Sequence, residues 1–274
     1  MRQTFALIEL TFREAFARKI FLAFMGISTL VCLLFIFALN LDIVDGFQAS
    51  VSFFGKQAPQ LARVEDVLKT LESLIALGLF TGGVFLSLFA TSNLIPGLLQ
   101  PGNIDLLLSK PISRPKILLG RYLGAVAIVA FNIVYLVFFS WLILSIKTGL
   151  WNAGFLASSL LIIITFAILY GLMTLLALLS QSGAFALMGT YFVIFFSPLL
   201  LQRDQIYALL SHKIYGFILD GLYYFFPKTP ELGKMTSDLV MGIPVQSWMP
   251  LWSSLLFGFL MLALSLLIFT RKNY

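Results

Sequence analysis

The stretch Leu106-Leu-Leu-Ser-Lys-Pro-Ile-Ser-Arg-Pro-Lys-Ile-Leu-Leu-Gly-Arg121 is a short basic segment between two long apolar runs. Proline removes a backbone donor, so Pro111 favours the end of one helix. Ser113 and Pro115 are typical of the start of the next helix. The stretch therefore predicts a proline-bounded polar turn that joins two membrane-spanning helices on their aqueous side.

The composition of the whole chain supports a membrane location. Of its 274 residues, 60% are hydrophobic and 11% are charged, whereas soluble domains have about 45–50% apolar residues. The net charge of +6 comes from basic residues that flank apolar runs. Nucleic-acid binding needs basic residues gathered on one soluble face, so the sequence does not predict a nucleic-acid partner.

The N-terminal segment, residues 1–19, has an amphipathic pattern. Phe5, Ile8, Phe12 and Phe16 share one face of a helical wheel, which predicts an interfacial elbow helix. From Ile20 an uncharged run follows that is long enough to cross about 30 Å of hydrocarbon.

The hydrophobic pattern predicts an all-α integral membrane protein with a single domain, residues 1–274. A polar segment, 42–70, separates the first two spans and has helical spacing in its second part. Before the last span, residues 206–226 are apolar but contain His212, Lys213 and Asp220, so we expect a re-entrant or interfacial helix that ends at Pro227. The six predicted spans are about 20–40, 71–95, 117–146, 153–179, 184–201 and 251–270.

The distribution of charge predicts the orientation of these spans. With both termini cytoplasmic, the inside segments hold ten basic and three acidic residues, and the outside segments hold eight basic and nine acidic residues. This excess of positive charge inside favours a multi-pass protein of the inner or plasma membrane with cytoplasmic termini.

Several classes of enzyme are disfavoured by the residues that are missing. The sequence contains no P-loop motif. His212 and Cys32 are its only histidine and cysteine and lie in different segments, which argues against zinc sites and Cys-His or Ser-His-Asp catalysis. No charged residue falls at the centre of a predicted span, and the main polar group there is Asn132, which suits an interhelical hydrogen bond. The sequence thus predicts no catalytic, metal or cofactor site in this chain.

Two G-x-x-x-G motifs, Gly78–Gly82 and Gly120–Gly124, allow close approach of helix backbones. Packing within one chain and packing between two copies are both compatible with these motifs.

Taken together, the chain resembles the permease subunits of ABC-2-type ABC transporters over essentially its whole length. The entry Leu10-Thr-Phe-Arg-Glu-Ala-Phe-Ala-Arg-Lys-Ile-Phe-Leu-Ala23 resembles the elbow helix of that family. Gly102-Asn-Ile-Asp-Leu-Leu-Leu-Ser-Lys-Pro-Ile-Ser-Arg114, followed by Leu118-Leu-Gly-Arg-Tyr-Leu-Gly124, resembles the family's loop between spans two and three. Tyr223-Tyr-Phe-Phe-Pro227 and the terminal Phe269-Thr-Arg-Lys-Asn-Tyr274 are weaker matches.

This resemblance implies a homodimer of permeases driven by two copies of a separate P-loop ATPase, which binds the ATP and Mg²⁺. For Lys110 and Arg114, docking of the ATPase is favoured over simple anchoring at lipid headgroups. For Lys116 and Arg121, docking and anchoring are equally favoured. The implied docking residues are Asn103, Ile104, Asp105, Leu106, Ser109, Lys110, Pro111, Ser113 and Arg114 in a coupling helix, and Arg13, Glu14, Arg18 and Lys19 in the elbow helix.

Within the family, the organisation resembles the branch that serves maturation of nitrous oxide reductase, in which the permease can transmit mechanical work to an extracytoplasmic partner. The outer segment 202–250 suits an interfacial lid with Tyr207, Tyr215, Tyr223, Tyr224 and Trp248. Two other functions stay open at this point: a non-transporting membrane scaffold and a secondary carrier.

Overall fold

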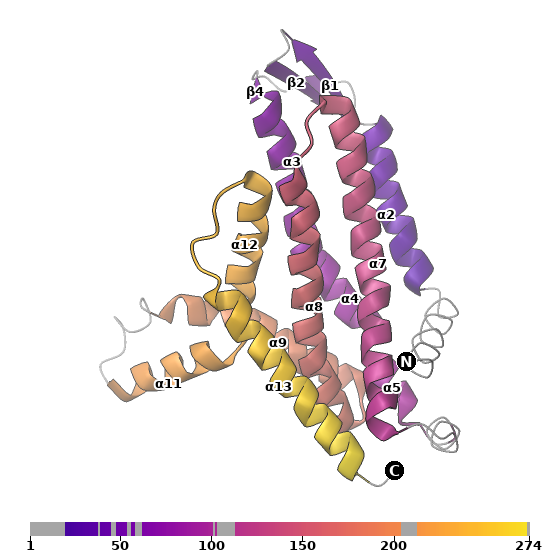
Figure 1. Ribbon diagram of the computed structural model, residues 1–274, viewed down its shortest axis with the longest axis vertical. Helices are drawn as coiled ribbons and strands as arrows, with labels where there is room; N and C mark the ends of the chain where they lie inside the picture. Colours follow the sequence, from indigo (N-terminus) through magenta and orange to yellow (C-terminus); the bar gives the residue numbers. More distant parts are fainter. Residues whose placement is uncertain are drawn as a thin grey trace.

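The computed structural model describes residues 20–37, 39–44, 48–53, 56–57, 62–100, 102, 113–203 and 213–272. Within these ranges the protein is a bundle of long helices with a small sheet at one end (Figure 1). We call this the sheet end. The opposite end, where α5 (Leu94–Leu98), the start of α7 and the end of α13 lie, is called the α5 end.

In the part of the chain that the structure describes, five helical stretches are long and apolar enough to cross a membrane, which is the pattern of a multi-pass membrane protein. Four of the six predicted spans coincide with α7, α8, α9 and α13, and a fifth lies within the stretch formed by α3, η1, α4 and α5. The first predicted span contains α2 (Ile20–Phe37), whose apolar part is shorter than the other five. The five stretches are Val64–Leu98, α7 (Arg114–Thr148), α8 (Ala153–Ser180), α9 (Gly183–Leu201) and α13 (Met249–Arg271).

A small antiparallel sheet follows α2, in a region where no strand was predicted. It consists of β1 (Leu39–Val44), β2 (Gln48–Phe53), β3 (Lys56–Gln57) and β4 (Ala62–Arg63), and β2 pairs with each of the other three. The alternation of apolar and polar residues over 39–44 and 49–53 is the pattern of a strand, but it is too short to stand out beside the long apolar runs.

The second predicted span is not a simple helix. It consists of α3 (Val64–Gly78), the π-helical segment η1 (Leu79–Gly83), α4 (Val84–Thr91) and α5. The sequence predicted a break beyond the span at Pro96, but the chain turns at Ser92 and Asn93. Pro96 lies in the first turn of α5, where its missing N–H costs no helical hydrogen bond.

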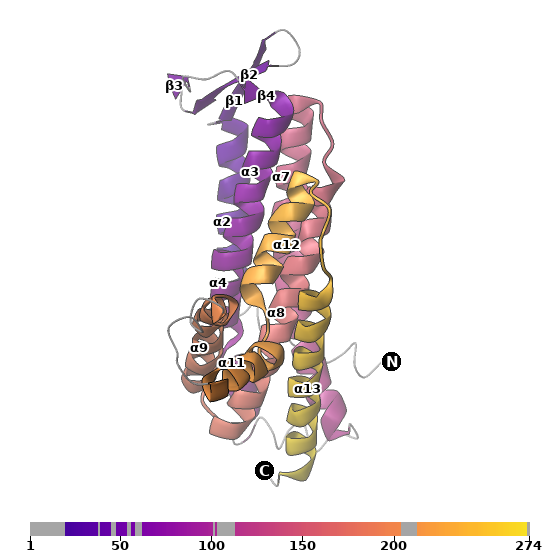
Figure 2. The same ribbon diagram turned by 90° about the vertical axis from the view of Figure 1, so that its left-hand side faces the viewer.

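The described part of the segment between α9 and α13 contains two helices, whereas one was predicted. Helix α11 (Lys213–Phe225) ends before Pro227, as predicted. A second helix, α12 (Thr229–Met241), was not predicted; its start has Pro230 and Glu231 in the first turn, and it ends at Gly242, which has a φ of 74°. Figure 2 shows α12 alongside α3 and α8, near the sheet end.

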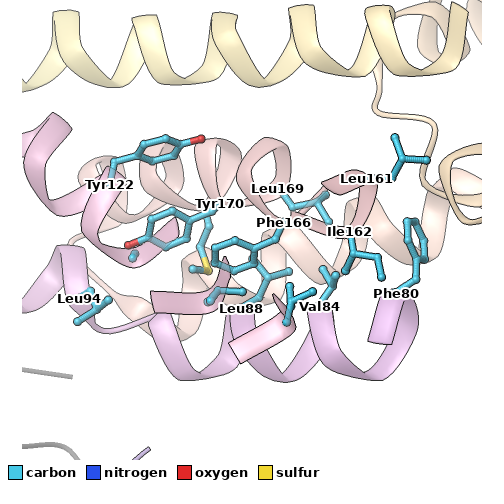
Figure 3. Packing of buried hydrophobic residues seen from close by; sticks show 14 of the residues in the cluster. Phe80, Val84, Leu88, Leu94, Tyr122, Leu161, Ile162, Phe166, Leu169 and Tyr170 are labelled. Carbon is cyan, nitrogen blue, oxygen red and sulfur yellow. The ribbon is translucent and has the colours of Figure 1, made fainter. Parts of the chain in front are cut away.

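The core of the bundle surrounds α8. Of the apolar stretch of α8, 67% is buried inside the protein, compared with 28–39% for the other four stretches. Figure 3 shows its side chains Phe166, Leu169 and Tyr170 packed between Tyr122 of α7 and Val84 and Leu88 of α4. This central helix contains no charged residue.

Candidate functional site

Most of the docking residues that the sequence predicts lie outside the described part of the chain. This is the case for residues 103–112, with Asn103, Ile104, Asp105, Leu106, Ser109, Lys110 and Pro111, and for the elbow residues Arg13, Glu14, Arg18 and Lys19. His212 and Tyr207 also lie outside it. Of the predicted docking set, Ser113 and Arg114 can be placed.

Ser113 and Arg114 form the start of α7, as the sequence predicted. Ser113 is the N-cap residue, with an extended backbone, and a proline follows in the first turn. The Arg114 Nη1 donates a hydrogen bond of 2.8 Å to the carbonyl oxygen of Lys272, directly after α13. The Lys272 Nζ in turn donates to the carbonyl of Leu178, near the end of α8, at 3.3 Å.

These contacts connect three helix ends at the α5 end. The last carbonyls of a helix lack partners within the helix and carry partial negative charge, so cationic donors stabilise them. The start of α7 is therefore linked to the end of α13, and the end of α13 to the end of α8, by side-chain hydrogen bonds. Lys116, two residues after Arg114, is exposed, whereas Arg121 is buried, so these two residues, for which docking and anchoring were equally favoured, have different surroundings.

The π-helical segment η1 separates two apolar grooves. The larger groove, of about 490 Å³, lies between η1–α4, α8, α9 and the start of α12. The smaller, of about 320 Å³, lies between α2, η1–α4 and α7. Gly82 and Leu86 line both grooves. Because π-helical turns are frequent at functional sites, this part of the second stretch is a candidate for conformational change.

The two G-x-x-x-G motifs have different surroundings. Gly120 and Gly124 are buried in α7, so this motif packs within the chain. A Cβ atom added at Gly78 or Gly82 would meet no atom within 4 Å. Gly78 and Gly82 therefore leave space at the surface of the bundle, where they line the smaller groove.

Helix α11 is held to the bundle by a polar cluster around Tyr223. The guanidinium of Arg203 lies 3.8 Å from the centre of the Tyr223 ring, and Arg203 also pairs with Asp220 at 3.4 Å. The Tyr223 hydroxyl donates to Glu231 Oε1 at 2.6 Å. Burial and this carboxylate raise the pKa of Tyr223 to about 12.

Lys228 completes this cluster between α11 and α12. Its Nζ donates to Ser253 Oγ at 2.9 Å and lies 4.5 Å from the centre of the Tyr223 ring. Burial lowers the pKa of Lys228, because the charged form loses its hydration. Of the aromatic residues predicted for an outer lid, Tyr224 and Trp248 are exposed, whereas Tyr223 points into the cluster.

One buried ionisable residue was missed by the sequence analysis. Glu72 of α3 is fully buried, with an exposed fraction of 0%. The sequence predicted no role for it, because it lies near the start of the predicted second span and not at its centre. The signal that could have identified it is the four-residue spacing of Val64, Leu68, Glu72 and Ala76, which places the carboxylate in the middle of the buried stripe of α3.

Asn152 is the residue that meets this carboxylate. As the N-cap of α8, it accepts a hydrogen bond from the Gly154 N–H on Oδ1. Its Nδ2 donates to Glu72 Oε2 at 2.6 Å and to the carbonyl oxygen of Val240 in α12 at 2.8 Å. Asn132, the predicted interhelical polar residue, instead donates to the Ile128 carbonyl of its own helix at 3.0 Å.

The described ranges contain no group of three or more His, Cys, Asp or Glu side chains that could hold a metal ion. In comparisons with known proteins, no model of a protein family matches this sequence. A search of curated proteins also gives no match.

Proposed function

We propose that this chain is the membrane-spanning permease subunit of an ABC-2-type ABC transporter. In this proposal α2 is the first of six spans, residues 1–19 form the elbow helix, and both termini face the cytoplasm. A separate ATPase in two copies hydrolyses ATP, and the permease uses that energy for export or for mechanical transmission across the membrane. The chain itself performs no catalysis.

The observation that best supports this proposal is the link between helix ends at the α5 end. The predicted coupling segment, 103–112, connects α5 to α7. Through Arg114 and Lys272, the start of α7 is bonded to α13 and α8. A soluble motor that pushes on this segment would therefore move three packed helices together, which is the requirement for rigid-body transmission.

The open glycine motif supports a second copy of the chain as a partner. Gly78 and Gly82 border a groove with free space, and large apolar side chains such as Leu86 and Ile27 are exposed beside it. In lipid, small residues of this kind allow helices of two subunits to approach closely. We assign this face to the contact between the two permeases.

The contact between copies can be tested with glycine substitutions. Gly82→Leu should fill the groove and shift the chain from dimer to monomer, measured by native mass spectrometry from mild detergent. Gly26→Leu is the matched control, because a Cβ atom added at Gly26 also meets no atom within 4 Å and Gly26 lines neither groove. A Gly82→Leu protein that stays dimeric would place the contact elsewhere.

The transporter function is tested by purification of the chain at native expression from mild detergent, followed by mass spectrometry and an ATPase assay. We expect a stoichiometric P-loop protein that is lost when Lys110 is changed to Glu. Lys234→Glu, which reverses an exposed charge on α12, is the control. We expect the P-loop protein to stay bound to this variant. Recovery of a lone chain without ATPase activity would favour a scaffold, and uptake by that lone chain would favour a secondary carrier.

A further inference from the structure

The carboxyl group of Glu72 is an ionisable group inside the bundle for which the proposed function gives no role. It lies in a helical stretch apolar enough to cross a membrane, and its exposed fraction is 0%. Asn152 donates to Oε2. No donor within the described residues reaches Oε1. Ionisable residues in such surroundings are costly to keep, which indicates a function.

The neighbouring charges do not neutralise this carboxyl. The positive charge that acts on the Glu72 carboxyl is that of Lys69, one turn earlier. The Lys69 Nζ, however, is bonded to Glu65 Oε1 at 2.7 Å on the surface of the helix. A buried carboxylate without a bonded cation and with an unsatisfied oxygen is unfavourable. The charged residues on the elements packed around Glu72, within the described ranges, are Arg63, Glu65, Asp66, Lys69, Arg114, Lys116, Arg121, Lys147, Glu231, Lys234 and Asp238.

Helix α12 covers this group. Asn152 Nδ2 bridges Glu72 and the Val240 carbonyl of α12. One turn further along α12, Ser237 Oγ and Ser73 Oγ share a hydrogen bond of 2.9 Å. Among the elements around Glu72, α12 is short, with 13 residues, and is followed by a largely exposed connection, 242–249. Of these elements it is therefore the one best placed to move and admit water.

We propose that Glu72 is a proton-binding site: the protonated carboxyl holds α12 against α3 and α8, and ionisation releases α12. The neutral acid can remain buried with one amide donor. The ionised carboxylate needs further donors, and displacement of α12 lets water supply them. Acidic pH therefore favours the closed position of α12, and alkaline pH favours its release.

Release of α12 would change the larger groove. Thr229 and Pro230 at the start of α12 form part of its wall, opposite Phe80 of η1. Gly233 packs against the same Phe80 ring, so that a Cβ atom there would lie 3.0 Å from it. The proton on Glu72 thus controls whether this apolar groove is closed by α12.

Proton binding itself can be measured by infrared difference spectroscopy on the full chain in lipid nanodiscs, between about pH 5 and about pH 9. We expect the carbonyl band of a buried protonated carboxylic acid, which is lost at alkaline pH and is absent from Glu72→Gln. Glu65→Gln is the matched control on the same helix, because Glu65 is exposed, and it should keep the band. A wild-type spectrum without this band would overturn the proposal.

The movement is tested by distances between two spin labels in a Cys32→Ser background. Lys234→Cys on α12 and Leu74→Cys on α3 provide exposed attachment sites. We expect a single short distance at acidic pH and an added longer one at alkaline pH. Glu72→Gln should keep the short distance throughout, and Glu65→Gln should respond as wild type. Distances that do not depend on pH, or that depend on it equally in Glu72→Gln, would exclude the release of α12.

Discussion

At the α5 end, the half-buried side chains of Arg114 and Lys272 donate to carbonyls at the ends of neighbouring helices. At the sheet end, the fully buried carboxyl group of Glu72 accepts a hydrogen bond from the half-buried side chain of Asn152. Cations beside exposed helix ends retain part of their hydration, so each contact contributes modestly. At the sheet end we expect a larger loss of stability, because removal of one hydrogen-bond donor leaves its acceptor group unsatisfied.

The largest expected effect is that of Asn152→Ala at the sheet end. It removes the cap on Gly154 and leaves Glu72 and the Val240 carbonyl without their amide donor, so we expect a loss of about 3 kcal/mol in the free energy of unfolding. Unfolding with a denaturing detergent, followed by tryptophan fluorescence, measures this. Asn132→Ala removes an amide that bonds only its own helix and should cost much less.

A second substitution at the same end tests the close approach of α12 to α8. A Cβ atom at Gly154 would collide with the carbonyl oxygen of Leu239, and we expect Gly154→Ala to cost about 2 kcal/mol through the forced displacement of α12. The same unfolding assay applies, and Gly26→Ala, at a position with free space, is its control. An unchanged Gly154→Ala protein would show that α12 is loosely packed.

A smaller effect is expected from Arg114→Ala at the α5 end. It removes one hydrogen bond between a cation and the carbonyl of Lys272, with a cost of about 1 kcal/mol. Arg114→Lys keeps the positive charge near this carbonyl and should recover part of the loss. If Arg114→Ala destabilises the protein as much as Asn152→Ala, the contrast between the two ends fails.

The smallest effect is expected from Lys272→Ala. The Lys272 Nζ donates to the Leu178 carbonyl over a long distance of 3.3 Å, so we expect a loss of about 0.5 kcal/mol. In the proposed transporter, Lys272→Ala and Arg114→Ala should weaken the coupling of ATP hydrolysis to transport more than they lower stability. This coupling is measured as the amount of ATP hydrolysed per unit of transport.

Local properties of the sequence are sufficient to predict where the long helices run. In hydrocarbon the backbone must satisfy its own hydrogen bonds, so long apolar runs form helices whatever surrounds them. The start of α7 at Ser113 and Pro115 and the end of α11 before Pro227 follow from the same local rules, because caps and prolines act within one turn.

The contacts of each helix face, in contrast, become visible once the helices are packed together. Gly78–Gly82 and Gly120–Gly124 share one motif, but the first borders open space and the second is buried. Glu72 and Glu65 lie on the same helix, and α12, which was not predicted, covers one while the other stays exposed. Burial depends on elements distant in the chain, and hydropathy along the sequence contains no information about which of them come together.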